Sequence, residues 1–348
     1  MIDIALLKEF SETPGVSGFE GRIRQTVTEF ISPFVDEYYN DNMGNLIAIK
    51  RGKGDKKVML AGHLDEIGFI VSHINDEGFI RFHPLGGFDP KTLTAQRVIL
   101  HGKKDIIGVM GSKPVHMMTK EEMGKPLSIK DFFIDTGLPK EELDKYIEIG
   151  TAITRERELI EMGECINGKS LDNRIAVYII AELLRELKDV ELPYDLYAVF
   201  TVQEEVGVRG AMIASHAINP DFAIAIDGTV AFDLPGAQPQ EQCTQLGKGT
   251  AIKIMDSMTI CDPRLVKYLK DLADKNDISW QAELLPAGGT DTAAMQRYGK
   301  NGSIAGALSV PMRHLHQVIE MVHKKDVRDT IDLLKLTVQH LDNYDWSH

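Results

Sequence analysis

The sequence predicts an α/β fold: a doubly wound, mostly parallel sheet with an inserted β-rich domain. Near both ends of the 348-residue chain, apolar strand patterns alternate with amphipathic helix patterns, which is typical of repeated βα units. In the middle, short β-type runs separated by Gly, Asp, Asn and Pro turns replace this alternation. We therefore expect a discontinuous α/β domain of residues 1–67 and 163–348, interrupted by a barrel or PDZ-like domain of residues 68–162.

Two helices and two strands are expected before the insertion. The first helix, within 4–15, stops at Pro14 and Gly15, and the second, within 20–34, has apolar residues on one face. The patterns then predict strands over 45–50 and 57–65. The second strand is almost entirely apolar before its last residues, which is typical of a strand covered by helices on both faces.

The inserted segment carries short β patterns and one helical pattern. Strands are expected over 68–74, 79–85, 97–102 and 106–112, and a helix over 140–149.

The α/β alternation returns after the insertion, and no internal repeat is seen. Expected helices cover 173–188, 209–218, 262–276, a start at 290 and 324–341, and expected strands cover 194–202, 221–227, 251–256 and 302–310.

Composition excludes several classes of partner. The chain is 43% hydrophobic and 26% charged, as expected for a soluble globular protein, and it carries a net charge of -13 with a pI near 5.3. This acidic balance argues against nucleic acid or an anionic membrane as the main partner. No apolar run reaches the ~20 residues of a membrane helix, and the first residues lack a secretion-signal pattern.

The three cysteines point to a reducing compartment. Cys165, Cys243 and Cys261 are scattered and show no CxxC spacing, so we expect reduced, mostly buried thiols in a cytoplasmic protein.

Acidic and imidazole side chains follow the apolar strands at the points where ligands bind in open α/β sheets. One candidate of this kind is Asp172, at the start of a predicted helix. The others are His63 and Asp65 after 57–62, Glu204 and Glu205 after 194–202, Asp227 after 221–226, and His314 and His316 after 302–310.

Imidazoles and carboxylates without a thiolate suit zinc, cobalt or manganese. His63 and Asp65 are two residues apart and point the same way on an extended strand, so one can bind metal while the other orients it. Two divalent ions would be neutralised by three carboxylates and a bridging hydroxide, which leaves a fourth carboxylate for proton transfer.

Taken alone, each of these residues has a plainer explanation. Asp172 could cap its helix, and a glutamate pair usually lies on a solvated face. Glu204 and Glu205 resist that explanation because a mostly apolar run precedes them. Spacing alone does not separate the roles of these two glutamates, nor those of the two histidines after 302–310.

The chain as a whole resembles the M42 metallo-aminopeptidases, which include the tetrahedral and glutamyl aminopeptidases and proteins labelled endoglucanase M or cellulase M. Eight stretches carry the resemblance in the family's order: "PGVSGFE" (14–20), "DNMGNLIA" (41–48), "AGHLDEIGF" (61–69), "SLDNRIA" (170–176), "QEEVGVRGA" (203–211), "AIDG" (225–228), "GGTDTAAM" (288–295) and "SVPMRHLHQ" (309–317). In the last of these, His314 takes a position where the family often has an aromatic residue.

The resemblance implies a dinuclear hydrolase with Zn²⁺ or Co²⁺ as the metal. Glu204 would be the general base and acid acting on a metal-bound water, with Asp65 as the carboxylate behind His63. The implied ligands are His63 and Asp227 for one ion, Glu205 and His316 for the other, and Asp172 as the bridge.

The resemblance also implies substrates and partners. The enzyme would remove N-terminal residues from short peptides, and the turn with Gly289, Thr290 and Asp291 would contact the substrate. Homo-oligomers are expected: dimers formed through the inserted domain, and tetrahedral dodecamers built from them.

Three alternatives stay open from the residues. Paired carboxylates are also the groups of glycoside hydrolases, as the endoglucanase label of some relatives suggests, but that chemistry needs neither His63 nor His316. A metal-dependent deacylase or carboxypeptidase would use a similar site. A non-catalytic, metal-stabilised oligomer that binds peptides is the third.

Overall fold

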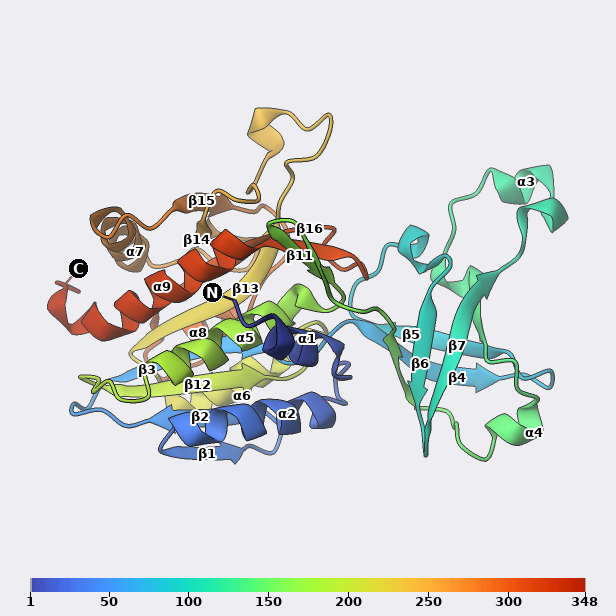
Figure 1. The fold of residues 1–348 in the computed structure, drawn as a ribbon, viewed down its shortest axis with the longest axis horizontal. Coiled ribbons are helices and arrows are strands. Elements are labelled where there is room, and N and C mark those ends of the chain that lie inside the picture. Colours follow the sequence, from blue (N-terminus) through green and yellow to red (C-terminus); the bar gives the residue numbers. More distant parts are fainter. Residues whose placement is uncertain (1, 348) are drawn as a thin grey trace.

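The structure is a computed structural model that describes residues 2–347. The chain forms an α/β domain built on one large sheet, and a closed β-barrel stands beside it (Figure 1). Both chain ends lie in the α/β domain (Figure 1). The predicted fold class is confirmed.

The large sheet has a parallel centre and antiparallel margins. Its strands are β1 (Glu37–Asn40), β2 (Leu46–Lys50), β3 (Lys57–His63), β10 (Ile160–Met162), β11 (Cys165–Gly168), β12 (Asp195–Thr201), β13 (Phe222–Val230), β14 (Thr250–Met255), β15 (Trp280–Leu284), β16 (Ile304–Arg313) and β17 (Glu320–His323). The order is β1-β2-β12-β3-β13-β16-β17-β11-β10, with β14 and β15 branching from β16. Strands β12, β3, β13 and β16 are parallel, and strands nearer the edges pair antiparallel, except that β15 at the end of the branch pairs parallel with β14.

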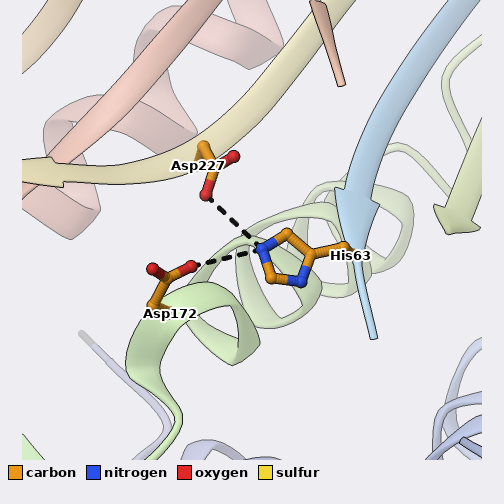
Figure 2. Close-up of side chains that lie close together, drawn as sticks. All are labelled: His63, Asp172 and Asp227. Carbon is orange, nitrogen blue, oxygen red and sulfur yellow. Dashed lines mark hydrogen bonds and ion pairs between the residues drawn. The ribbon is translucent and has the colours of Figure 1, made fainter. Parts of the chain in front are cut away.

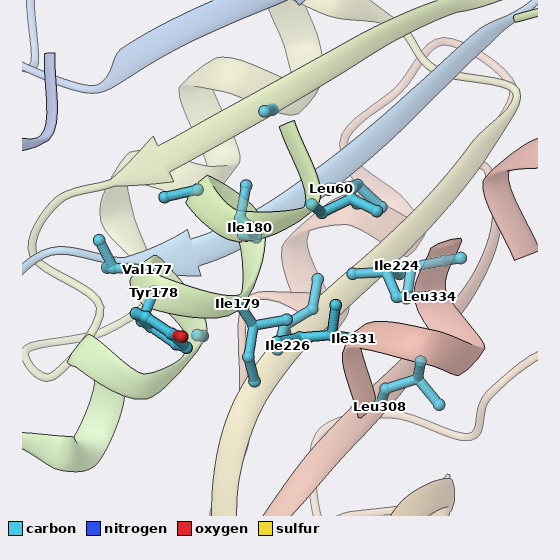
Figure 3. Close-up of a cluster of buried hydrophobic side chains, with 14 of the residues drawn as sticks. Leu60, Val177, Tyr178, Ile179, Ile180, Ile224, Ile226, Leu308, Ile331 and Leu334 are labelled. Atoms are coloured by element: carbon cyan, nitrogen blue, oxygen red, sulfur yellow. The ribbon is translucent and has the colours of Figure 1, made fainter. Parts of the chain in front are cut away.

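Helices cover both faces of this sheet. They are α1 (Ile4–Glu12), α2 (Gly21–Ile31), α5 (Leu171–Glu186), α6 (Arg209–Ile218), α7 (Pro263–Lys275), α8 (Thr292–Arg297) and α9 (Lys324–His340). Helices α5 and α9 pack on one face (Figure 3), and α6 and α8 pack on the other.

The apolar run of β3 is explained by this double cover. Val58 and Leu60 point into the core under α5, whereas Met59 and Ala61 point into the core under α6. Successive side chains of a strand alternate between faces, so both sets must be apolar.

The inserted barrel closes in the order β4-β5-β8-β7-β6-β9 and has its own core. Its strands are β4 (Gly68–Ile74), β5 (Ile80–Leu85), β6 (Arg97–His101), β7 (Asp105–Ser112), β8 (Phe132–Asp135) and β9 (Ala152–Arg155), and its short helices are α3 (Lys120–Met123) and α4 (Lys140–Leu143). All six strands fall within the predicted insertion, although β10, near its end, joins the large sheet. The boundaries at 68 and 162 stay a prediction.

Two expectations need correction. The helix expected over 140–149 ends at Leu143, because tight turns then bring both Leu143 and Ile147 into the barrel core while Ile149 stays exposed. The cysteines are free, but only Cys261 is buried, since Cys165 and Cys243 lie on strand and loop margins. Among the described residues, no helix combines the length and apolar character that crossing a membrane requires.

Candidate metal centre

The predicted site residues meet at the carboxyl ends of the central strands. His63 is the last residue of β3, and it pairs in register with Thr201 at the end of β12. Asp227 lies within β13, and His316 follows β16. The parallel centre of the sheet therefore brings residues from distant parts of the chain to one edge.

Asp172 lies between the two imidazoles. Its Oδ1 is 3.2 Å from His63 Nε2, and its Oδ2 is 3.3 Å from His316 Nε2. The Asp227 Oδ1 atom lies 3.8 Å from the same His63 nitrogen, and Figure 2 shows both aspartates pointing at this imidazole. On the other side, Glu205 Oε2 lies 3.5 Å from His316 Nε2. One carboxylate thus links two clusters of possible ligands.

These clusters are the groups in the described chain that could hold metal ions. In each, the ligand atoms lie within 4.8 Å of one another. The groups are His63, Asp172 and Asp227, and Asp172, Glu205 and His316. His314 belongs to neither group, whereas His316 belongs to one of them.

Asp65 organises the site from behind. Its backbone oxygen lies 2.9 Å from His63 Nδ1, which leaves Nε2 directed at the cluster. Its carboxylate accepts hydrogen bonds from the backbone N–H groups of Glu204 (3.0 Å) and Glu205 (3.2 Å), and from the Ser17 hydroxyl (2.6 Å). The backbone oxygen of Asp65 therefore holds His63, and its buried carboxylate holds the glutamate pair.

The two glutamates face different imidazoles. Glu204 Oε2 lies 3.8 Å from His63 Nε2, whereas Glu205 points at His316. The turn that separates them from β12 includes Gln203 at a φ of 55°, a left-handed conformation that is costly for a non-glycine residue. Glu20 supports this turn by accepting a hydrogen bond from Gln203 N at 3.1 Å.

Burial is the largest influence on the carboxyl groups of the centre. It raises the pKa of Glu205 to about 8, and the neighbouring Asp172 carboxylate adds to the effect. It also raises the pKa of Asp227 to about 8, where Asp172 again adds and His63 opposes. The pKa of Glu204 lies well above its usual value because of burial, which His63 opposes and the Asp227 carboxylate reinforces. These shifts reflect crowded like charges in a buried site.

The imidazoles respond in the opposite sense. Burial alone would lower their pKa values, but the hydrogen bond to Asp172 raises the pKa of His316 to about 9. Hydrogen bonds to Asp172 and Asp65 likewise raise the pKa of His63 well above its usual value. The pKa of Asp172 is lowered: burial would raise it, but the bonds from His316 and His63 prevail.

A second buried cluster of charged residues, centred on Glu66, holds Ser170, the residue before α5. The Glu66 carboxylate, fully buried, lies 2.7 Å from Lys169 Nζ and 3.7 Å from Arg174 Nη2, and it accepts a 2.6 Å hydrogen bond from Ser170 Oγ. Ser170 is left-handed with a φ of 58°, and the first turn of α5 is not helical at Asp172. The cluster thus stabilises the unusual backbone that presents Asp172.

The turn predicted to contact substrate lies beside the centre. Asp291, 2% exposed, accepts a hydrogen bond from the Thr201 hydroxyl, while its Oδ1 has no hydrogen-bond partner among the described residues. Burial raises the pKa of Asp291 to about 6. Gly289 packs against Met258, and the Thr290 hydroxyl donates a hydrogen bond to the Thr292 hydroxyl. Substrate contacts by Gly289, Thr290 and Asp291 stay a prediction.

Sequence reasoning missed two buried charged residues, Glu320 and Arg155. Glu320 accepts hydrogen bonds from the backbone N–H groups of Asp172 (3.0 Å) and His316 (2.9 Å). Arg155, on the last barrel strand, donates a hydrogen bond to His316 O at 2.9 Å. No motif marks either residue in a single sequence, because both act through the folded backbone of other segments.

Comparison with known proteins identifies the family of the chain. The model of the M42 glutamyl aminopeptidase family matches residues 44–333. The lysyl aminopeptidase of Pyrococcus furiosus is 35% identical over 357 residues, which cover 100% of both chains. The glutamyl aminopeptidase of Lactococcus lactis is 32% identical and covers 89% of this chain and 88% of its own.

Solved structures share the whole fold. The TET1 peptidase of Pyrococcus horikoshii, which assembles into a tetrahedron or a large octahedral shell, has a TM-score of 0.87 at 32% identity and covers 96% of this chain and 98% of its own. An endoglucanase structure from Thermotoga maritima has a TM-score of 0.78 at 31% identity and covers 96% of each chain. The family model, the enzymes that match and the ligand clusters agree that this chain belongs to the M42 family of aminopeptidases and is a peptide hydrolase.

Proposed function

We propose that this chain is a dinuclear, metal-dependent aminopeptidase that removes N-terminal residues from peptides. The observation that carries the proposal is the position of Asp172, whose two oxygens face His63 and His316 at 3.2 Å and 3.3 Å. A carboxylate shared by two His/carboxylate groups is the donor set expected of a two-metal hydrolytic site. The mixture of nitrogen and oxygen donors suits Zn²⁺ or Co²⁺.

The charges of the centre fit two cations. Burial and like charge raise the pKa values of Glu205 and Asp227 to about 8, so the protein's own cationic groups do not balance the ionised carboxylates. The Glu205 Oε1 atom is buried and, among residues 2–347, has no hydrogen-bond partner. Divalent cations among these oxygens would offset both effects.

Glu204 is placed for proton transfer. Two bound divalent cations would polarise the scissile carbonyl and make a hydroxide nucleophile available near neutral pH. Glu204 belongs to neither ligand group in the described chain, and its raised pKa suits a group that both takes and gives a proton. It would accept a proton from the attacking water and deliver it to the leaving nitrogen as the C–N bond breaks.

The same charges favour substrates with a free N-terminus. Asp291 is a buried carboxylate outside both ligand groups, and its Oδ1 has no hydrogen-bond partner among the described residues, so a protonated α-amino group would complement it. A glycoside hydrolase would need no such amine and no histidines, and the family relationship does not favour it. The matching relatives are named for opposite residues, lysyl and glutamyl, so the preferred N-terminal residue stays open.

We also propose that the chain forms homo-oligomers through the barrel. The outward face of β7 exposes Ile107 (62%) and Val109 (47%), which pair with Ile99 and Arg97 of β6. Apolar side chains side by side on a strand favour contact with another protein surface. The similar TET1 peptidase assembles into closed shells. A cytoplasmic location stays a prediction.

Changing the two glutamates separately tests their division of work. Glu204→Gln keeps both cations and lowers kcat by about 10²–10⁴-fold, because only proton transfer is lost. Glu205→Gln loses one cation, because a ligand is lost. Elemental analysis after gel filtration and single-turnover kinetics measure both effects. Near-normal turnover by the Glu204→Gln variant would disprove its role as base.

A substrate panel tests the reaction class. Peptides with a free N-terminus are hydrolysed, and their acetylated forms react with about 10⁴-fold lower kcat/KM, because the site's carboxylates lose their cationic partner. Chelation abolishes the reaction, and carboxymethyl-cellulose is not cleaved with or without metal. Hydrolysis of acetylated peptides at equal rates would indicate a deacylase or carboxypeptidase, and cellulose cleavage in EDTA a glycosidase.

Chelated protein loses stability as the pH rises. The folded-state pKa values of Glu205 and Asp227 (about 8) and His316 (about 9) exceed their ordinary values of 4.5, 3.8 and 6.5. Their stabilising contribution is therefore complete below the ordinary pKa values and is lost progressively as the pH rises from there to about 8 for the two carboxyl groups and about 9 for His316.

Thermal unfolding in EDTA at pH 6, 7.5 and 9 measures this slope. Zn²⁺ or Co²⁺ reverses it, because the ligands bind metal in their deprotonated forms. Glu205→Gln, which removes one of the titrating groups, flattens the slope in EDTA. An unfolding temperature independent of both pH and added metal contradicts the charge balance proposed here.

Charging the barrel face tests assembly. The double variant Ile107→Lys/Val109→Lys shifts the mass measured by light scattering to smaller species, because buried lysines would lack partners. Ile213→Lys, on the exposed face of α6, is the control and keeps the mass of the wild type. An unchanged mass for the double variant places the interface elsewhere.

A further inference from the structure

Glu320, the first residue of β17, spans two ligands of the centre. Its side chain is buried, with the residue 1% exposed. The Oε1 atom accepts a hydrogen bond from His316 N at 2.9 Å, and Oε2 accepts one from Asp172 N at 3.0 Å. Each oxygen of this single carboxylate thus holds the backbone of one ligand.

Both ligands need such support. His316 is left-handed with a φ of 63°, and His314 nearby has a φ of 59°, conformations that β-carbon contacts disfavour. Asp172 sits in the non-helical first turn of α5. A buried N–H without a partner would add a further cost at each position. The carboxylate of Glu320 satisfies both N–H groups at once.

Arg155 holds the same segment from the barrel side. It is 2% exposed, and its Nη1 donates a 2.9 Å hydrogen bond to His316 O. Its guanidinium lies 5.4 Å from the ring centre of Phe88, which in turn stacks on Phe69 at 4.5 Å. Burial lowers the pKa of Arg155, and Glu320 is the charged neighbour that opposes this most.

A loop of the barrel also lies close to two of the proposed ligands. A methyl group placed on Gly87 would lie 3.7 Å from His316 Nδ1, and one on Gly86 would lie 3.5 Å from Glu205 Cβ. The loop after β5 therefore lies close to Glu205 and His316, two of the three ligands of one proposed metal site. Arg155 and this loop make the barrel part of that site's surroundings.

We infer that Glu320 and Arg155 are positioning residues that hold Asp172 and His316 in the geometry that binds a cation. This cation, called the second, is the one that Asp172, Glu205 and His316 would hold. Glu320 fixes the backbone of both ligands, and Arg155 ties His316 to the barrel. The inference rests on the proposed function, because it takes Asp172 and His316 as metal ligands. It assigns neither residue a contact with substrate.

Glu320→Gln is the sharpest test. The carboxamide offers one acceptor oxygen and one NH₂ group, so it cannot accept from both backbone N–H groups. We expect the affinity for the second Co²⁺ ion to fall by about 10- to 100-fold, with a smaller change for the first, because His316 belongs to the second site alone. Apoprotein is titrated with Co²⁺ and followed by visible absorption and calorimetry. The absorption bands of the second ion shift, because its ligand geometry changes.

Two glutamate controls separate positioning from general destabilisation. Glu182→Gln removes another buried carboxylate, 3% exposed, on α5 away from the centre. Glu161→Gln removes an exposed carboxylate on β10 that pairs with Lys324. Both controls keep the wild-type Co²⁺ spectrum and affinities. Thermal unfolding in EDTA ranks the stabilities of all variants without metal.

Arg155 provides an independent test. Arg155→Met weakens binding of the second Co²⁺ ion and shifts its spectrum, and Arg155→Lys, which keeps the charge, has a smaller effect. These variants decide the matter if Glu320→Gln does not fold. Wild-type affinities and spectra in folded Glu320→Gln, or in Arg155→Met, would overturn the inference while the proposed function stands. Failure of the wild type to bind two Co²⁺ ions would overturn the proposed function, and the inference with it.

Discussion

Concentrated negative charge around Asp172 is the constraint on which the rest of the site depends. Asp172 and Asp227 are buried, Glu204 and Glu205 lie close by, and within residues 2–347 their ion-pair partners are the imidazoles of His63 and His316. Such a group is stable only when its backbone is held firmly and cations complete it. The surrounding structure provides the first condition: the left-handed conformations of Ser170, Gln203 and His316 are each supported by a buried carboxylate that accepts a hydrogen bond from a main-chain N–H group or a hydroxyl.

The sequence predicts those parts of the structure that depend on local pattern. The apolar run ending at His63 indicated a strand covered on both faces. The change from alternating helix and strand patterns to short β-type runs after residue 67 indicated the insertion. The residues that follow the strands also indicated the edge of the sheet at which the candidate site residues lie. The choice between Glu204 and Glu205 did not follow from spacing. In the structure the two glutamates face different imidazoles, and the separate roles proposed for them rest on this difference.

The elements that were missed depend on long-range contacts. Strands β8 and β9 have four residues each, too few to show a period, and the barrel's closure defines them. Glu66 forms its cluster with residues beyond the whole insertion. Glu320 accepts hydrogen bonds from main-chain N–H groups, which the pattern of side chains in a sequence does not reveal. Buried charged residues of this kind are recognised from what they contact, and one sequence does not record contacts.

The point at which the barrel interrupts the chain has a consequence for how this fold can vary. His63 and Asp65 come just before the barrel, Asp172 comes just after it, and Arg155 lies at its exit. The insertion therefore divides the ligand set in the chain, so the barrel is not a detachable module. Its outer turns can change in length without touching the centre, whereas its entry and exit strands are held to the geometry of the ligands. Grafting this barrel onto another hydrolase would also transfer Arg155, one of the residues proposed to hold the centre.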